Sequence, residues 1–503
     1  MGGHHQPMQA VIHTCAFRGI DTVPVSVQVH LSNGLPAMMI VGLADKAVAE
    51  SKERIRAALS SMGLALPAKR ISINLAPADV TKEGAHFDLP IACGLLAAMG
   101  VVPSDAFDDA LILGELSLDG RLAPVAGILS AALYASSQNL SLICPQENGT
   151  EARWAGADLT ILPTPSLMAL MHHIKGLDWI APPAEMPQIT MPRYPDMADV
   201  RGQETAKRAI EIAAAGQHHL LMIGPPGAGK SMLASRLPGL LAPLRPEESL
   251  EVTMIHSMAG LTSHGHDDDQ RLILARPYRD PHHSASMPAL VGGGARAKPG
   301  EISLAHHGVL FLDELPEFNR TALDSLRQPL ETGEVIIARA NHHIRYPAKF
   351  QLVAAMNPCR CGYLSDPQHA CSRAPECGRT YMARLSGPLL DRFDIIIDVT
   401  ALPAHHLLSD DRAESSDVIA ARIRASQDFA EKEVDAVDDP IKWLSHEARA
   451  FLETHIDNLD ISARGYGKIL RTARTIANLD HSKEIERAHL SEAIAYRKIR
   501  LLS

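Results

Sequence analysis

Hydrophobic and polar residues alternate in the first third of the chain, over residues 23–31 and again over 71–75. Strict alternation is typical of half-buried β-strands. Between these runs, apolar residues over 48–62 keep a helical spacing that ends at Gly63, a suitable C-cap. The pattern therefore predicts an α+β domain over residues 1–175.

Short continuous apolar runs replace the alternation further along the chain, over residues 220–223, 309–312 and 352–356. Runs of this length are typical of buried strands. They predict an α/β core over residues 196–404. A proline-dense stretch over 176–195 precedes it and is expected to be an extended linker.

The last region, residues 405–503, has an almost entirely helical pattern. Ile469, Ala473 and Ile476 lie at positions i, i+4 and i+7, and residues 485–499 are amphipathic. We expect a helical domain here.

A glycine-rich motif follows the apolar run at 220–223, and it matches G-x-x-x-x-G-K-[ST] in full. Its residues are Gly224, Pro225, Pro226, Gly227, Ala228, Gly229, Lys230 and Ser231. Backbone N–H groups of such a loop surround phosphates, and the following helix N-terminus favours their charge. Lys230 is expected to pair with the β- and γ-phosphates and Ser231 to hold Mg²⁺. The motif predicts that the chain binds a nucleoside triphosphate.

Polar side chains follow the other two buried runs. Asp313 and Glu314 end the run at 309–312, and Asn357 ends the run at 352–356. Beside a phosphate loop, Asp313 can hold Mg²⁺ through water, and Glu314 can polarise the attacking water. Asn357 is expected to orient that water, although an Asn at a strand end also forms turns.

The composition allows about three globular domains in 503 residues. The net charge of −10 argues against a generally basic surface but leaves room for a local basic channel. No apolar stretch approaches the ~20 residues of a membrane span, and the first residues lack the pattern of a signal peptide. A cytoplasmic location without membrane contact is expected.

Four of the seven cysteines fall close together, in a segment over 358–380 rich in Gly, Pro and Ser. They are Cys359, Cys361, Cys371 and Cys377. In a reducing compartment such a cluster indicates metal rather than disulfides, and four thiolates form a closed tetrahedral Zn²⁺ site. His369 is a possible substitute for one sulfur, and a coincidental or redox cluster is the alternative.

The order of these motifs resembles the AAA+ ATPases, with a P-loop core followed by a helical lid. Longer strings are similar to the Mg-chelatase-like branch, in particular to the ComM/YifB family. Examples are Pro281-His-His-Ser-Ala-Ser, Phe311-Leu-Asp-Glu-Leu-Pro-Glu-Phe and Asn357-Pro-Cys-Arg-Cys-Gly. The resemblance covers nearly the whole chain.

The family resemblance implies roles for two arginines. Arg392, in Leu389-Leu-Asp-Arg392-Phe-Asp, matches the arginine finger that completes a neighbouring subunit's site. Arg464 matches the sensor-2 arginine of the lid, with Arg471 as its rival. A finger that acts in a neighbouring site implies a ring, and the family suggests a homo-hexamer.

Two basic insertions are candidates for DNA contact. Apolar segments over 334–338 and 344–350 flank a tip that predicts a β-hairpin, and a glycine-rich segment begins at Gly292. The basic residues of the two insertions are Arg296, Lys298, Arg339, His342, His343 and Arg345. Loops at these places grip the DNA backbone in related rings. The alternative is that the hairpin only pads the subunit interface.

The first region resembles the Lon-type peptidase domain, through Gly114–Gly127 and Thr81–Ala85. That enzyme needs a serine activated by a lysine amine. Here the serine position falls on His86 and the lysine position on Leu129, so this pair cannot hydrolyse peptides.

Together these features predict a ring-forming, ATP-dependent DNA helicase that promotes branch migration during DNA uptake and recombination. The alternative is a Mg-chelatase-type motor that remodels a protein partner. A Lon-like protease is a third reading, which the missing serine and lysine count against.

Overall fold

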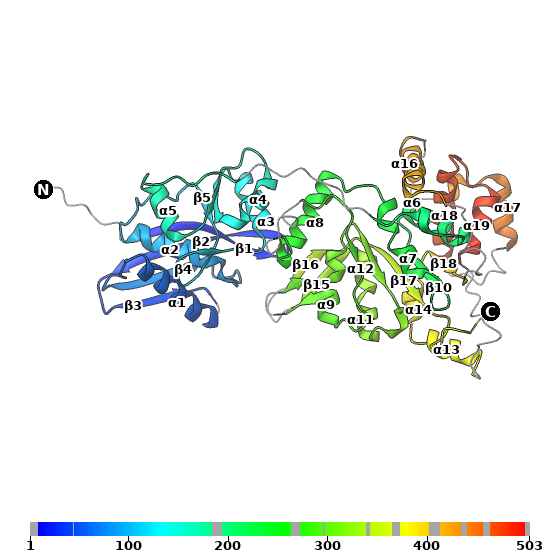
Figure 1. Cartoon of the computed structure of the whole chain (residues 1–503), viewed down its shortest axis with the longest axis horizontal. Coiled ribbons are helices and arrows are strands. Elements are labelled where there is room, and N and C mark those ends of the chain that lie inside the picture. The colour runs from blue at the N-terminus through cyan, green and yellow to red at the C-terminus, as the bar shows by residue number, and fades with distance from the viewer. Residues whose placement is uncertain are drawn as a thin grey trace.

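The computed structural model describes residues 9–43, 45–183, 194–262, 272–294, 297–338, 343–364, 373–401, 413–433, 440–455 and 463–497. Figure 1 shows three parts along one long axis: the N-terminal region, a central α/β region, and a group of helices at the far end. The predicted linker lies partly outside the described residues.

Seven strands form the sheet of the N-terminal region, in the order β3-β4-β2-β1-β5-β8-β9. The strand predicted over 23–31 is the centre of β2 (Asp21–Ser32), whose buried and exposed positions alternate as its two faces require. The remaining strands are β1 (Gln9–Arg18), β3 (Ala37–Val41), β4 (Arg70–Ala76), β5 (Ala110–Ile112), β8 (Ser141–Pro145) and β9 (Ile161–Thr164).

The helix predicted over 48–62 is α1 (Asp45–Ser61), and the chain leaves it through Gly63 at φ +73°. Helix α2 (Asp88–Ala98) is apolar on every side and is buried along its whole length. The other helices of this region are α3 (Ile128–Ser137), α4 (Gly149–Ala152) and α5 (Leu167–Ile174).

The two positions that the resemblance aligns with a peptidase serine and lysine are both buried. His86 lies in a short 3-10 helix (Ala85–Phe87), with its Nε2 3.1 Å from the carbonyl oxygen of Cys15. Leu129 packs inside α3. Neither side chain supplies the hydroxyl or the amine that a Ser/Lys pair needs.

The central region contains a five-stranded sheet in the order β11-β14-β17-β10-β18, with every neighbouring pair parallel. The three predicted buried strands are β10 (Leu220–Ile223), β14 (Val309–Leu312) and β17 (Gln351–Met356), and all their residues are buried. The edge strands are β11 (Tyr278–Arg279) and β18 (Ile395–Asp398). Because parallel strands end at one edge of a sheet, the residues that follow β10, β14 and β17 meet there.

Helices cover this sheet and connect its strands. The two long ones are α6 (Glu204–Gly216) and α8 (Pro246–Ala259). The short ones are α7 (Lys230–Ala234), α9 (Met287–Val291), α10 (Glu301–Leu304), α11 (Arg320–Ser325), α12 (Arg327–Thr332), α13 (Glu376–Met382) and α14 (Gly387–Leu390).

The predicted hairpin is present as β15 (Glu334–Ala338) paired with β16 (His343–Pro347). A second, smaller pair joins β12 (Gly292–Gly293) to β13 (Lys298–Pro299). The two lie side by side, since a Cβ placed on Gly292 would lie 2.9 Å from Ile337 Cδ1.

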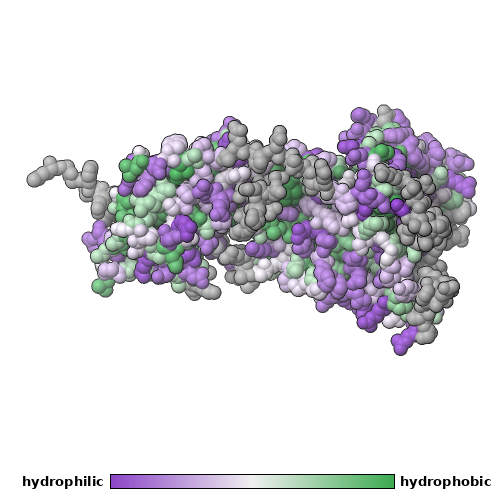
Figure 2. Space-filling view, in the orientation of Figure 1, coloured by the Kyte–Doolittle hydropathy of each residue, from purple (hydrophilic) through white to green (hydrophobic). Residues whose placement is uncertain are grey.

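The last region consists of α16 (Ser416–Glu433), α17 (His446–His455), α18 (Ala463–Leu479) and α19 (Arg487–Ala495). The predicted stripe of Ile469, Ala473 and Ile476 is buried on α18, which packs against α6, α16 and α19. Figure 2 shows mainly hydrophilic residues on the visible surface of this part, as expected where apolar faces point inward. Among the described helices, none combines the length and apolarity needed to span a bilayer.

The C-terminal end of α8 joins the central region to the N-terminal region. The Ser257 hydroxyl donates to Glu151, and it accepts the N–H of Gly127 at 3.1 Å, at the start of α3. These groups are buried, so the contact is a packed interface rather than a loose tether.

Candidate functional site: a phosphate loop and its facing edge

The predicted phosphate loop lies between β10 and α7. Gly227 and Gly229 adopt φ +74° and +90°, which an L-residue rarely adopts, and an added Cβ at Gly227 would meet open space. Lys230 Nζ donates to the carbonyl oxygens of Gly224 and Pro225 at 2.8 and 2.9 Å. Burial lowers the pKa of Lys230, and the carboxylates of Asp313 and Glu314 act in the opposite direction. The loop therefore has the conformation expected of a triphosphate-binding loop, with the Lys230 ammonium group inside it.

The two acids after β14 face this loop. Ser231 Oγ donates to Asp313 Oδ2 at 2.6 Å, which brings together two oxygens of the kind that Mg²⁺ prefers. Glu314 adopts φ +51°, a strained conformation for a residue with a side chain. Its N–H donates to Asp313 Oδ1 at 2.8 Å, and its Oε2 lies 3.2 Å from His283 Nδ1.

Asn357 joins the same group from the end of β17. Its Oδ1 accepts from Lys230 Nζ at 3.2 Å, although the two residues are 127 positions apart in sequence. Lys230, Ser231, Asp313 and Asn357 thus form one connected set at the carboxyl edge of the sheet, with Glu314 beside them. This set matches the donors that a Mg²⁺–nucleotide complex requires.

Arg392 lies at the edge formed by the amino ends of the strands, opposite the carboxyl ends that carry Lys230. Arg392 precedes β18 and Lys230 follows β10, and these two strands are parallel neighbours. Its Nη2 donates to Glu331 on α12, and its backbone oxygen accepts from Lys468 Nζ at 2.6 Å. Burial lowers the pKa of the Arg392 guanidinium, and the nearby charges of Arg464 and Arg327 lower it further.

Helical spacing explains how these arginines come together. Arg464 lies one turn before Lys468 on α18, and Arg327 lies one turn before Glu331 on α12, so each shares a helix face with a residue that touches Arg392. Sequence reasoning missed Arg327, because its place beside Arg392 depends on the tertiary contact between Glu331 and Arg392. The Arg471 side chain is 63% exposed, and its Nη2 lies 4.0 Å from Asp394 Oδ1, which also pairs with Lys468 Nζ at 3.1 Å.

Three of the six predicted DNA-contact residues are described. Lys298 is exposed, and its Nζ donates to the carbonyl oxygen of Ala259 at 3.2 Å. His343 is exposed at the start of β16, and the Arg345 side chain is 70% exposed, 4.0 Å from Glu334. Arg296, Arg339 and His342 lie outside the described residues.

Three of the four predicted zinc ligands gather after β17. The sulfur atoms of Cys359, Cys361 and Cys377 all lie within 4.8 Å of one another. Cys371 and His369 lie outside the described residues. Cys15, Cys93 and Cys144 are buried in the N-terminal region, and burial raises the pKa of all three thiols, as inert core cysteines require.

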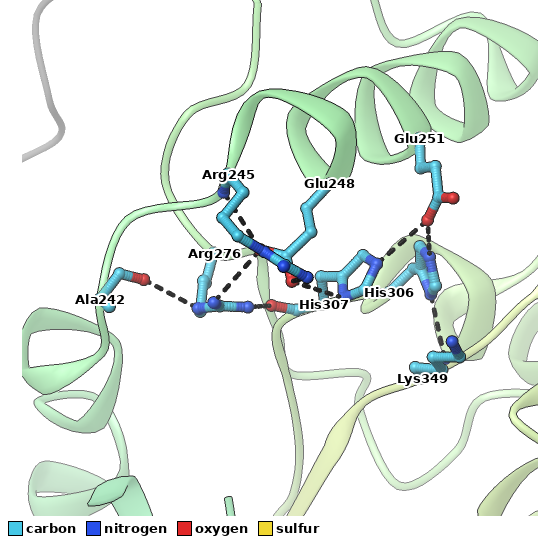
Figure 3. A network of polar contacts seen from close by, with 8 residues as sticks. All are labelled: Ala242, Arg245, Glu248, Glu251, Arg276, His306, His307 and Lys349. Carbon is cyan, nitrogen blue, oxygen red and sulfur yellow. Dashed lines mark hydrogen bonds and ion pairs between the residues drawn. The ribbon is translucent and has the colours of Figure 1, made fainter. Parts of the chain in front are cut away.

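A second group of possible metal ligands, Glu251, His306 and His307, joins α8 to the turn before β14 (Figure 3). Both imidazole Nε2 atoms lie 3.0 Å from Glu251 Oε2. The Lys349 N–H donates to His306 Nδ1 at 3.0 Å, so Nε2 carries the proton of this ring and donates to Glu251. A metal on Nε2 would need a proton on Nδ1, facing that donor. The group is therefore a hydrogen-bond network rather than a metal site.

The sheet order, the phosphate loop and the Asp–Glu turn define the AAA+ class of P-loop proteins. Three family models match consecutive parts of the chain. They are "Subunit ChlI of Mg-chelatase" over residues 27–148, "Magnesium chelatase, subunit ChlI" over 196–407, and "Magnesium chelatase, subunit ChlI C-terminal" over 412–497.

Full-length relatives refine this class. Competence protein ComM of Haemophilus influenzae is 43% identical over 509 residues, covering 98% of each chain. Uncharacterized protein YifB of Escherichia coli K12 is 42% identical over 503 residues, covering 97% of each. The chain therefore belongs to the ComM/YifB family of Mg-chelatase-like AAA+ proteins, as the sequence motifs predicted.

A more distant similarity supports the peptidase-like interpretation of part of the chain. Lon protease 2 of Bacillus subtilis is 26% identical over 179 residues, which cover 31% of this chain and 32% of that protein. A Lon-like N-terminal domain is suggested by this match.

Proposed function

We propose that this chain is an ATP-hydrolysing ring that moves along DNA and promotes branch migration during DNA uptake and recombination. The observation that carries the proposal is the separation of two half-sites. One edge of the sheet bears Lys230, Asp313 and Glu314, and the opposite edge bears Arg392 with the charges of Arg464 and Arg327 nearby. Neither edge forms a complete ATPase site alone. Head-to-tail assembly of copies would bring the Arg392 edge of one copy to the phosphate loop of the next.

In this arrangement Lys230 binds the β- and γ-phosphates, and Ser231 and Asp313 hold Mg²⁺. When bound, Mg²⁺ neutralises charge that builds up on the phosphate oxygens. Glu314 accepts the proton of the attacking water, and Asn357 orients that water. Arg392, Arg464 and Arg327 of the next copy then face the γ-phosphate from across the interface. Arg464 acts here in trans, because it lies with Arg392 and away from its own phosphate loop.

The DNA part of the proposal depends on the two neighbouring hairpins. They present Lys298, His343 and Arg345 on exposed surfaces, in a chain whose net charge is −10. Backbone contacts by such residues give binding that is independent of sequence and sensitive to salt. The Haemophilus influenzae relative is named a competence protein, and this supports a role in DNA uptake.

Forked, three-way or four-way DNA should increase the rate of ATP hydrolysis by the purified full-length chain. Force on the β15–β16 hairpin would then reach Asn357, because β16 is followed directly by β17, which ends at Met356. The measurement is steady-state phosphate release with and without each DNA, together with strand displacement. If every DNA structure leaves the rate unchanged, the DNA proposal is wrong.

Arg345→Ala should weaken DNA binding and reduce its salt dependence by about one unit of slope, since one phosphate contact is lost. Fluorescence anisotropy with a labelled fork at several salt concentrations measures both quantities. Arg121→Ala is the matched control, because its side chain is also highly exposed (78%) but lies in the N-terminal region. An unchanged slope for Arg345→Ala would remove this residue from the interface.

A Mg-chelatase-type motor that remodels a protein partner is the second candidate, favoured by the three family models. It shares the ATP chemistry, so stimulation by DNA separates the two candidates. A Lon-like protease is the third candidate, and His86 and Leu129, at the positions predicted for the serine and the lysine, count against it.

The proposal also includes a structural Zn²⁺ held by Cys359, Cys361 and Cys377, with Cys371 as the fourth ligand from the sequence. Thiolates in this number suit a closed tetrahedral zinc site.

A further inference from the structure

The sulfur atoms of the cysteine cluster lie close together without forming a disulfide. Cys359 Sγ and Cys361 Sγ are 3.0 Å apart, against about 2.05 Å in a disulfide. Sulfurs bound to one tetrahedral Zn²⁺ at ~2.3 Å lie roughly 3.8 Å from one another. Small side-chain rotations bring all three sulfurs to that spacing, because they already lie within 4.8 Å of one another.

The first cysteine is attached directly to the nucleotide site. Cys359 is fully buried and follows Asn357 by two residues, and Asn357 accepts from Lys230. The Cys359 carbonyl oxygen accepts the N–H of Gly362 at 3.0 Å, which closes a tight turn. Any force that holds Cys359 therefore also limits the position of the Asn357 amide.

The same turn packs against the phosphate loop. Gly362 adopts φ +85°, and a Cβ placed on it would lie 2.7 Å from Pro226 Cγ and closer still to Pro226 Cδ. Real Cβ atoms do not approach a ring this closely, so the contact depends on glycine. The turn between Cys359 and Gly362 thus supports the loop that holds the triphosphate.

The third cysteine connects the cluster to the Asp–Glu turn. Cys377 lies on α13, and Arg384 follows the end of this helix by two residues. The Arg384 guanidinium donates to the Pro316 carbonyl oxygen at 3.2 Å and to Glu317 at 2.9 Å. These residues follow Glu314 by two and three positions. The cluster is therefore linked to the Asn357 turn, to the phosphate loop and to the segment that follows Glu314.

We infer that the thiolate cluster holds a Zn²⁺ ion that positions Asn357 and the phosphate loop, so that loss of the ion stops ATP hydrolysis while the rest of the chain stays folded. This inference deepens the proposed ATPase function and rests on it. The ion replaces a core that this short, polar segment cannot form. Displacing catalytic groups by about 1 Å costs about 10²-fold in rate.

Metal removal gives the first test. The full-length chain purified without chelators should contain one Zn²⁺, and removing it should lower the kcat for ATP about 10²-fold. Added Zn²⁺ should restore the rate, and added Ca²⁺ should not. Far-UV circular dichroism should change little. A zinc content near zero, or an unchanged kcat after complete removal, would overturn the inference.

A variant tests the contact between Gly362 and Pro226 independently of the Zn²⁺ ion. Gly362→Ala should keep its zinc but lose affinity for a non-hydrolysable ATP analogue, because the new Cβ displaces Pro226. Gly63→Ala is the matched control: it has the same left-handed strain at φ +73°, but an added Cβ has nothing within 4 Å. If both variants bind the analogue as the parent chain does, the turn does not support the loop and the inference is wrong.

The failures of the two proposals can be told apart. A zinc-loaded chain that hydrolyses no ATP, with or without DNA, contradicts the proposed function. A chain that hydrolyses ATP equally well with and without zinc contradicts only the positioning role of the cluster.

Discussion

Glu314→Gln should lower the rate of ATP hydrolysis by about 10²- to 10³-fold, the usual effect of removing a general base. The amide cannot accept the proton of the attacking water, but it has the same shape and can still bond to His283. Lys230 and the glycine-rich loop are untouched, so ATP should remain bound. Steady-state phosphate release and equilibrium binding of a fluorescent ATP analogue measure the two quantities separately.

Glu247→Gln is the control for this experiment, because Glu247 is an exposed acid in the first turn of α8, in the same domain. Its rate should match that of the unmodified chain. Normal turnover by Glu314→Gln would remove Glu314 from the base role and direct attention to another acid. Lost ATP binding would show instead that the substitution disturbs the loop.

The nucleotide edge could be predicted from the sequence because each of its parts is local. A buried run followed by a glycine loop, or by Asp313 and Glu314, places a polar group at a strand end wherever the strand lies. Parallel pairing then brings the ends together, as the Lys230–Asn357 hydrogen bond shows. The fold of β2, α1 and the β15–β16 hairpin was predictable for the same reason, since their patterns are periodic over one element.

The group of arginines at the opposite edge of the sheet could not be predicted from local sequence patterns. Arg327, Arg392 and Arg464 belong to different elements, and only packing of α12 and α18 around the start of β18 brings them together. The contact of Gly362 with Pro226 is equally non-local, because nothing near either residue in the sequence indicates the other. The docking of Ser257 on Gly127 and Glu151 likewise depends on how two separately folded cores meet.

Arg392→Ala should lower kcat by about 10³- to 10⁵-fold, the range expected for an arginine finger. Its guanidinium is held by Glu331 at the edge remote from its own phosphate loop, so it can reach a γ-phosphate only in another copy. ATP binding to the variant should therefore persist. Arg392→Lys should remain strongly impaired, because an ammonium lacks the planar fork of donors. Arg320→Ala, an exposed arginine of the same domain, is the control.

Mixing the two inactive variants tests the composite site directly. A ring that combines Arg392→Ala and Glu314→Gln subunits contains interfaces where an intact Glu314 faces an intact Arg392. Random assembly at equal amounts makes roughly a quarter of the interfaces complete in this sense. Phosphate release by the mixture should therefore rise well above that of either variant alone. A mixture that stays as inactive as its components would mean that Arg392 serves its own subunit, and the head-to-tail arrangement would then be wrong.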